Sequence, residues 1–406
     1  MTAPNRRMAV LLSGLVLGAY FLFLASGTGQ VLYEWSKEFA PYSIRRFLGM
    51  SKRYMLQYGH IFFLFSLLVL SRYIFVQERR TVLSGKPMDF CIRYSTAVFL
   101  FHFPVMFFFA AVTPYDKTVP WQQFVLLGST LFTSVGLGML CFAIKPRFDQ
   151  WQKRLVNLSE AHFPRPDIIR TPEALKITRS HSEILNQVKV IAMICVVLGH
   201  FSFHRLSSFQ IPGFDGAAPR FAVPTFFMIS GYFLMMSIDR SRLGAAAITI
   251  RRGFGLYYII VPMLLLTVVL DFFGFRANAE LYDYSDYYIT EDLRRPYTRF
   301  EIIAASISSL LYLNESWWFT LLEIHRGHGG MRAFSNDPFW FMCYLIAFST
   351  LLLIWRLVRG WWKFGLLATW LFVFGIPILL LAPLFLAGSL AYLIHQRWRL
   401  PDDVST

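Results

Sequence analysis

The sequence predicts an all-α, polytopic membrane bundle of about ten transmembrane helices, with an eleventh candidate segment and both termini in the cytoplasm. Hydrophobic residues make up 56% of the 406 residues, and charged residues only 16%, against about 25% in a typical soluble domain. Apolar runs long enough to cross a bilayer recur along the whole chain. The composition therefore excludes a soluble cytosolic enzyme, a disordered chain and a disulfide scaffold.

A spanning helix needs about 20 mainly apolar residues. Ten segments meet this requirement, at 8–26, 58–76, 92–112, 122–144, 185–203, 221–238, 253–271, 338–355, 362–380 and 381–396. Only Pro377 and Pro383 separate the last two, so one broken helix is the alternative there. The eleventh candidate, 302–322, carries Asn314 and Glu315 in its middle, which favours an interfacial or re-entrant piece.

The distribution of charge predicts which loops face the cytoplasm. If the termini are inside, the cytoplasmic stretches hold 23 Lys and Arg against 10 Asp and Glu, whereas the opposite face is balanced. This is the positive-inside pattern. The net charge of +15 is then explained by loops that face anionic lipid, and nucleic acid is not an expected partner.

A polar stretch at 145–184 divides the chain. It contains four prolines and no apolar run long enough to span. We interpret it as a cytoplasmic linker between a four-helix front part, residues 1–144, and a six-helix rear part, residues 185–406. The four cysteines lie in or beside apolar runs without paired spacing, so neither a disulfide framework nor a metal site is predicted.

Three ionisable side chains inside predicted spans are candidates for chemistry. Lys189 and His200 are eleven residues apart on one helix, so they share a face about 16 Å apart along its axis. Charged groups inside a span are costly and usually functional. The alternative is that Lys189 reaches the cytoplasmic surface while His200 bonds a neighbouring helix. His102, in the middle of the segment 92–112, either lines a site or serves packing.

The next predicted helix contains the sequence FFMISGY at residues 226–232. Its small pair, Ser230 and Gly231, permits close helix packing, while Ser230 and Tyr232 are also candidates for shaping a pocket. Four arginines follow this motif, namely Arg240, Arg242, Arg251 and Arg252. They form either an ordinary positive cytoplasmic loop or a site for phosphates, which Arg binds in a bidentate manner.

Taken together, these motifs resemble the acyltransferase-3 family of integral membrane acyltransferases. Its first helix bears a basic residue, ten residues and then His, its second bears FFxxSG, and its third opens with arginines and ends in Pro. The motifs at 189–200, 226–231 and 251–262 match in that order. NDPFWFMCYL at 336–345 looks like the family's H-x-WFL segment, which makes Trp340 a candidate pocket residue. Gly255 departs from the family, since many members carry a second Arg there.

The order of the segments is unusual for this family. Its last helices carry S-x-x-x-Y-L-x-H-x-P and then a span that closes in an acidic-Pro turn. Here the similar segments, STAVFLFHFPV at 95–105 and AIKPRF at 143–148, precede the other motifs, and Lys145 replaces the acidic residue. The sequence thus resembles the family circularly permuted, with its last four helices placed before its first six. Both pieces begin and end inside, so the join needs no inverted helix.

The resemblance implies a membrane O-acyltransferase that uses cytoplasmic acyl-CoA, either acetyl-CoA or succinyl-CoA, as a co-substrate without a permanently bound cofactor. The implied acceptor is a hydroxyl of a glycan outside the cell. His200 would act as general base or acyl carrier, and Lys189 would orient the donor. The remaining site candidates divide into the phosphate-binding Arg240, Arg242, Arg251 and Arg252 and the pocket residues His102, Ser230, Tyr232 and Trp340.

The expected setting is a bacterial inner membrane, with the lipid bilayer, the glycan acceptor and the machinery of polysaccharide synthesis or export as partners. The alternative function is a carrier or flippase for a lipid-linked glycan, in which His200 and Lys189 serve as a proton relay.

Overall fold

The computed structural model describes residues 6–39, 48, 51, 54–75, 85–163, 177–208, 221–282, 298–321, 331 and 333–398. Within these residues the chain forms helices and one isolated bridge. The longer elements are α1 Arg6–Ala25, α2 Thr28–Phe39, α4 Tyr54–Ile74, α5 Lys86–Val112, α6 Pro120–His162, α7 Arg179–Phe201, α8 Ala222–Arg240, α9 Ala245–Gly253, α10 Tyr257–Ala277, α11 Arg299–Leu310, α13 Trp340–Leu357 and α14 Trp362–Arg397. The predicted helical membrane bundle is confirmed.

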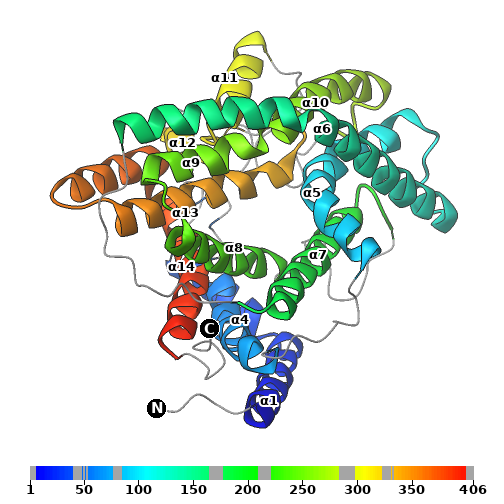
Figure 1. Ribbon diagram of the computed structural model, residues 1–406. Helices are drawn as coiled ribbons and strands as arrows, with labels where there is room; N and C mark the ends of the chain where they lie inside the picture. Colours follow the sequence, from blue (N-terminus) through cyan, green and yellow to red (C-terminus); the bar gives the residue numbers. More distant parts are fainter. Residues whose placement is uncertain are drawn as a thin grey trace.

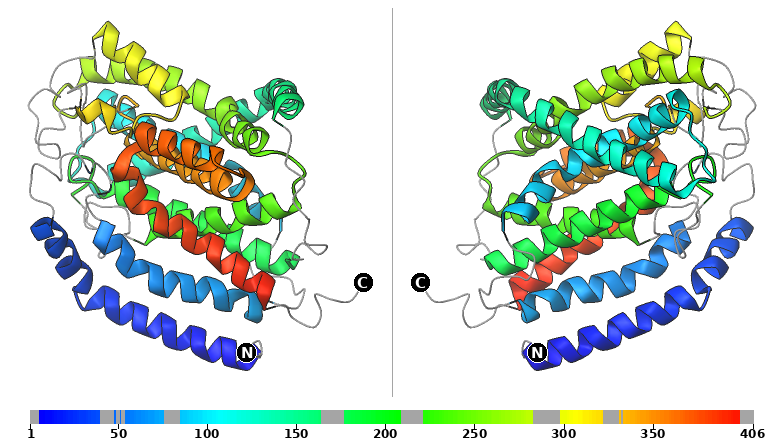
Figure 2. Two further views of the ribbon diagram at one scale, coloured as in Figure 1. Left: turned by 90° about the vertical axis from the view of Figure 1, so that its left-hand side faces the viewer. Right: turned by 90° about the vertical axis from the view of Figure 1, so that its right-hand side faces the viewer.

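Nine helices in the described part of the chain are long and apolar enough to cross a membrane. The last of them, α14, consists of two halves joined at Gly375, whose φ of 80° and ψ of 175° are not helical. The halves run in opposite directions (Figure 2). A Cβ at Gly375 would lie 2.5 Å from Cγ of Trp317, so glycine suits both the backbone and the space. The two predicted segments exist, but the break lies before the prolines.

The helices form a bundle in which α5, α8 and α13 are the most buried of the long apolar helices in the described part of the chain, with α8 near the middle of the view in Figure 1. On one side, α4 packs against α14 and α8, and α1 packs on α4. On the opposite side, α5 and α6 pack against each other and against α10, with α5 also on α7. The start of α1 and the end of α14 lie at the same end of the bundle (Figure 2). This fits an even number of passages in the described residues, since the two halves of α14 count as two.

The close packing of α8 on the second half of α14 depends on two glycines. A Cβ at Gly231 would lie 2.0 Å from the carbonyl oxygen of Phe385, and one at Gly388 would lie 1.7 Å from that of Met228. The Ser389 hydroxyl donates to the Gly231 carbonyl at 3.1 Å. Small residues at such crossings let helix backbones approach closely. The glycine of the FFMISG motif therefore has a packing role.

Residues 302–322 do not form one spanning helix. The 12-residue α11 is about 18 Å long, too short to cross the bilayer core. It begins at a capping box made by Thr298 and Glu301. Beyond it, the Asn314 amide donates to the Met331 carbonyl at 2.7 Å, which satisfies irregular backbone inside the protein.

The first part of the predicted linker is helical. α6 continues through Pro146 and ends at His162, whereas the predicted span ends at residue 144 and the polar linker begins at 145. Residues 164–176 lie outside the described residues. A proline removes only one backbone hydrogen bond of a helix, and here α6 is supported by packing against α9 and α10.

Two side chains of this extension hold α9. The Gln152 amide donates to the Arg251 carbonyl at 2.7 Å. Glu160 accepts from the backbone N–H of Gly244 at 2.7 Å, just before α9 begins, where a carboxylate is favourable. The extension thus fixes the short helix that carries two of the candidate arginines.

Candidate active site

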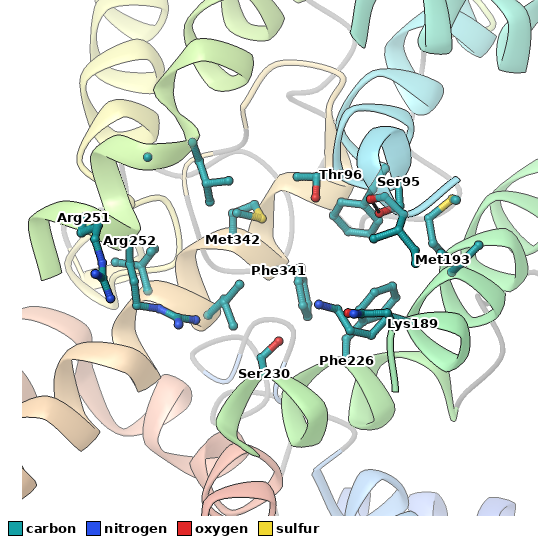
Figure 3. A pocket seen from close by; sticks show the side chains of 18 residues that line it. Ser95, Thr96, Lys189, Met193, Phe226, Ser230, Arg251, Arg252, Phe341 and Met342 are labelled. Carbon is teal, nitrogen blue, oxygen red and sulfur yellow. Dashed lines mark hydrogen bonds between the residues drawn. The ribbon is translucent and has the colours of Figure 1, made fainter. Parts of the chain in front are cut away.

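A cavity of about 370 Å³ lies between α5, α7, α8, α13 and the junction of α9 with α10 (Figure 3). We call it the cation cavity. Its lining comprises Ile92, Ser95, Thr96, Phe99, Asn186, Lys189, Val190, Met193, Phe226, Ser230, Arg251, Arg252, Gly255, Leu256, Phe341, Met342, Leu345 and Ile346. The front part of the chain contributes α5, so the cavity needs helices from both parts.

Three cations line this cavity, and none of the described residues that line it is Asp or Glu. Arg251 and Arg252 stand on one side and Lys189 on the opposite side, with Ser230 and Phe341 between them (Figure 3). None of the three cations forms an ion pair with a carboxylate in the described parts of the chain. Lys189 and Arg252 are partly buried, where a cation without a counter-ion is costly, so this arrangement favours an anionic ligand.

Helical spacing explains how α5 and α7 present polar side chains to the cavity. Asn186 lies three residues before Lys189 on α7, so both face the cavity. Ser95 and Thr96 face it from α5, one turn before Phe99. Hydroxyl and amide groups beside three cations give hydrogen bonds to a polar ligand.

Aromatic rings form the apolar part of the lining. The ring centroids of Phe99 and Phe341 are 5.4 Å apart, those of Phe226 and Phe341 are 5.5 Å apart, and those of Phe99 and Phe226 are 6.1 Å apart. Phe99 also lies next to His102, at 6.2 Å between centroids. The aromatic part of the lining therefore adjoins His102 through Phe99.

His102 and His200 form a hydrogen-bonded pair beyond these rings, which we call the histidine pair. The Nε2 of His102 lies 2.8 Å from the Nδ1 of His200, and the rings are nearly parallel, with an interplanar angle of 13°. His102 is fully buried and His200 is partly exposed. Neither lines the cation cavity, whose lining residues Phe99 and Met193 precede them by one and two turns on α5 and α7.

The structure brings together some of the predicted site residues and not others. Lys189, Ser230, Arg251 and Arg252 share the cation cavity, and His102 joins His200. The four other predicted residues belong to neither the cavity lining nor the histidine pair, namely Arg240, Arg242, Tyr232 and Trp340.

These four side chains have other surroundings. Arg240 and Arg242 are exposed near the end of α8. Tyr232 is buried and bonds the Nδ1 of His395 at 2.8 Å. Trp340 packs on Tyr344, at 5.3 Å between ring centroids. Exposure does not distinguish the arginines outside the cavity from those that line it, because Arg251 is exposed as well.

Sequence reasoning missed the polar residues on α5 and α7 that line the cavity, Ser95, Thr96 and Asn186. The helical spacing of Asn186 from Lys189 is the signal that identifies the first of them. It also missed Asn336, whose amide donates to the Leu100 carbonyl of α5 at 2.7 Å. That contact joins segments far apart in the sequence and has no local signal.

This geometry can bind an anion beside the arginines of α9 and supply an imidazole from α5 and α7, which form two walls of the cavity. Arginines bind phosphate oxygens in a bidentate manner, and an imidazole can accept a proton or carry an acyl group. Such an arrangement suits transfer of a group from a phosphorylated donor.

Searches of the curated proteins and of the solved structures gave no match. A family model described as an acyltransferase domain, that of acyltransferase-3, matches residues 183–401, which is more than half of the chain. The match contains Lys189, His200, Ser230 and the two arginines of the cation cavity. The chain therefore belongs to the acyltransferase-3 family and is a multi-pass membrane acyltransferase.

Proposed function

We propose that the protein transfers an acetyl or succinyl group from cytoplasmic acyl-CoA to a hydroxyl of a periplasmic or extracellular glycan. The observation that carries this proposal is the cation cavity, which three cations line without a lining carboxylate, and two of whose walls, α5 and α7, also carry the histidine pair. A CoA thioester has this pattern of charge, with phosphates at one end and a thin neutral arm that ends in the acyl group.

In this proposal Arg251 and Arg252 bind the CoA phosphates near the cytoplasmic face. A nucleotide cannot cross the hydrocarbon core, which is about 30 Å thick, so it stays at this end while the arm extends between the helices. Gln152 and Glu160 on the α6 extension hold α9 in place and thereby position both arginines. Arg240 and Arg242 lie outside the cavity and have no part in this binding mode.

Lys189 then lies along the path of the arm. Its amino group is 5.5 Å from the ring centroid of Phe233, and its side chain lines the cavity opposite Arg252. A cation at this place offsets the negative charge of the donor and orients it. The arm must pass the rings of Phe99, Phe226 and Phe341 to bring its thioester to His200.

His200 is the general base of the proposed reaction. The acceptor oxygen forms a bond to the thioester carbonyl carbon while its proton moves to the imidazole. The carbon–sulfur bond then breaks, and the CoA sulfur leaves and takes the proton back from the imidazolium. The products are the acylated glycan and free CoA. A covalent acyl-histidine would reach the same products in two transfers.

We also propose that the chain is a circular permutation of the family architecture. Supporting this, α5 from the front part completes the cation cavity and supplies His102, although the family match covers only residues 183–401. The ends of the described chain lie at the same end of the bundle (Figure 2), so a change in the order of the two parts requires no large change in the positions of the helices.

The proposed setting is a bacterial inner membrane. Acceptor glycans then come from the machinery of polysaccharide synthesis or export on the outer side. Residues 283–297, which include a Tyr-rich and acidic stretch between α10 and α11, lie outside the described residues.

The test uses purified protein in lipid nanodiscs with acetyl-CoA or succinyl-CoA and a soluble glucan oligosaccharide. We expect free CoA and acylated oligosaccharide in equal amounts, and neither product from a His200→Ala protein of normal thermal stability. His204→Ala is the matched control, because His204 is exposed just beyond α7. Unchanged acylation by the His200→Ala protein would refute the catalytic assignment.

A further inference from the structure

The hydrogen bonds of His102 determine which of its nitrogens carries the proton. Its Nδ1 lies 2.8 Å from the Phe99 carbonyl oxygen and 3.1 Å from that of Val98. A carbonyl oxygen can only accept a hydrogen bond, so this nitrogen is the N–H donor. Neither histidine of the pair has a carboxylate partner in the described residues, so we take both rings to be neutral. The Nε2 of His102 then has no hydrogen, and its lone pair accepts a hydrogen bond.

The orientation of the second ring follows from the first. His200 presents its Nδ1 to the Nε2 of His102 at 2.8 Å, and the acceptor there has no hydrogen, so Nδ1 of His200 must donate. A neutral imidazole carries only one N–H. The Nε2 of His200 is therefore the nitrogen with the free lone pair.

Other contacts hold His102 in the place that this chain of bonds requires. Pro104 lies inside α5, and because proline has no N–H, the Leu100 carbonyl lacks its helical partner. The Asn336 amide donates to that carbonyl at 2.7 Å. Asn336 is almost fully buried and precedes α13, so a second helix supports the turn of α5 that carries His102.

We propose that His102 is a positioning residue that holds His200 in the tautomer whose Nε2 is the reacting nitrogen. This inference rests on the proposed function, since it names the atom of His200 that takes the acceptor proton. The acceptor O–H gives its proton to Nε2 as the new carbon–oxygen bond forms, and Nε2 returns it to the sulfur as the carbon–sulfur bond breaks. The Nδ1–H of His200 stays bonded to His102 throughout and stabilises the transient imidazolium.

The kinetic test compares two variants of His102. His102→Phe keeps an aromatic ring but removes the acceptor, and we expect kcat to fall about 10²- to 10⁴-fold, the usual contribution of a placed general base, with the KM for acetyl-CoA unchanged. His102→Gln places an amide oxygen near the former Nε2 and should recover about tenfold, as one hydrogen bond would. A purely structural role would change folding and KM as well, with no rescue by Gln.

The tautomer is measured directly on the wild-type protein. Nitrogen-15 NMR of histidine-labelled protein in nanodiscs distinguishes a ring nitrogen with hydrogen from one without, and His200→Gln identifies the signals of His200. We expect Nδ1 of His200 to be protonated and Nε2 to be bare. The opposite tautomer, or a His102→Phe protein with the wild-type kcat, would overturn the proposal.

The two readouts separate this inference from the proposed function. Wild-type protein that releases no CoA with any acyl-CoA and oligosaccharide would refute the proposed function. An active wild-type protein whose His200 is protonated at Nε2 would refute only the role given to His102. Because the NMR measurement needs no variant of His102, a misfolded His102→Phe protein does not weaken the test.

Discussion

Replacing Arg252 by Ala should weaken binding of the acyl donor while leaving the acceptor unaffected. Arg252 is partly buried and lines the cation cavity, whereas Arg242, which precedes the same short helix, is exposed and lies outside the cavity. A hydrogen bond to a charged group is worth about 1.5–3 kcal/mol, which corresponds to about a 10- to 150-fold rise in the KM for acetyl-CoA. Arg242→Ala is a surface substitution worth about 0.5 kcal/mol or less, so we expect the KM for acetyl-CoA to rise at most about twofold.

The assay follows CoA release by purified protein in nanodiscs, with acetyl-CoA varied at saturating glucan oligosaccharide and then the reverse. A change in donor KM with little change in kcat is the expected signature of lost ground-state binding. Two results would refute the reasoning. The first is an equal rise in donor KM for Arg242→Ala, which would point to a general effect of positive charge. The second is an equal rise in the KM for the oligosaccharide.

Three further predictions concern the architecture. Gly388→Ala should lower the free energy of unfolding by about 1–3 kcal/mol through overpacking of α8 against α14, and so lower the thermal midpoint. The control is Gly128→Ala, where an added Cβ would meet nothing within 4 Å and the midpoint should not fall. Equal midpoints for the two variants would contradict the close helix crossing. Asn336→Asp removes the side-chain donor to the backbone of α5 and should lower the free energy of unfolding by about 1–3 kcal/mol. An unchanged thermal midpoint would show that this hydrogen bond does not contribute to stability. A rearranged chain, 177–406 followed by a flexible linker and 1–163, should retain CoA-releasing activity; an inactive but folded product would refute the permutation.

The spans were predictable because the bilayer requires about 20 apolar residues in each. The end of α6 and the break in α14 were not, because both depend on contacts between distant segments. Pro146 suggests a helix end, yet α6 continues where it packs on α9. Two prolines suggest a break near residue 380, yet the chain turns at Gly375, where Trp317 occupies the space beside the backbone.

In the candidate site too, local patterns were predictable and contacts between distant segments were not. Local spacing on one helix placed Lys189 and His200 on a common face, and the arginines after α8 were visible as a charge cluster. The sequence could not distinguish Arg252, which lines the cavity, from Arg240, which does not. The pairing of His102 with His200 joins residues 98 apart, so only the tertiary structure identifies it.

Proteoliposomes loaded with acetyl-CoA, with a glucan oligosaccharide supplied outside, test the central claim most directly. Protein molecules whose cytoplasmic face points inward should produce acylated oligosaccharide outside and an equal amount of free CoA retained within, and a His200→Ala protein should produce neither. Acylation that occurs only when both substrates share one side of the membrane, or that persists without the His200 imidazole, would contradict the account.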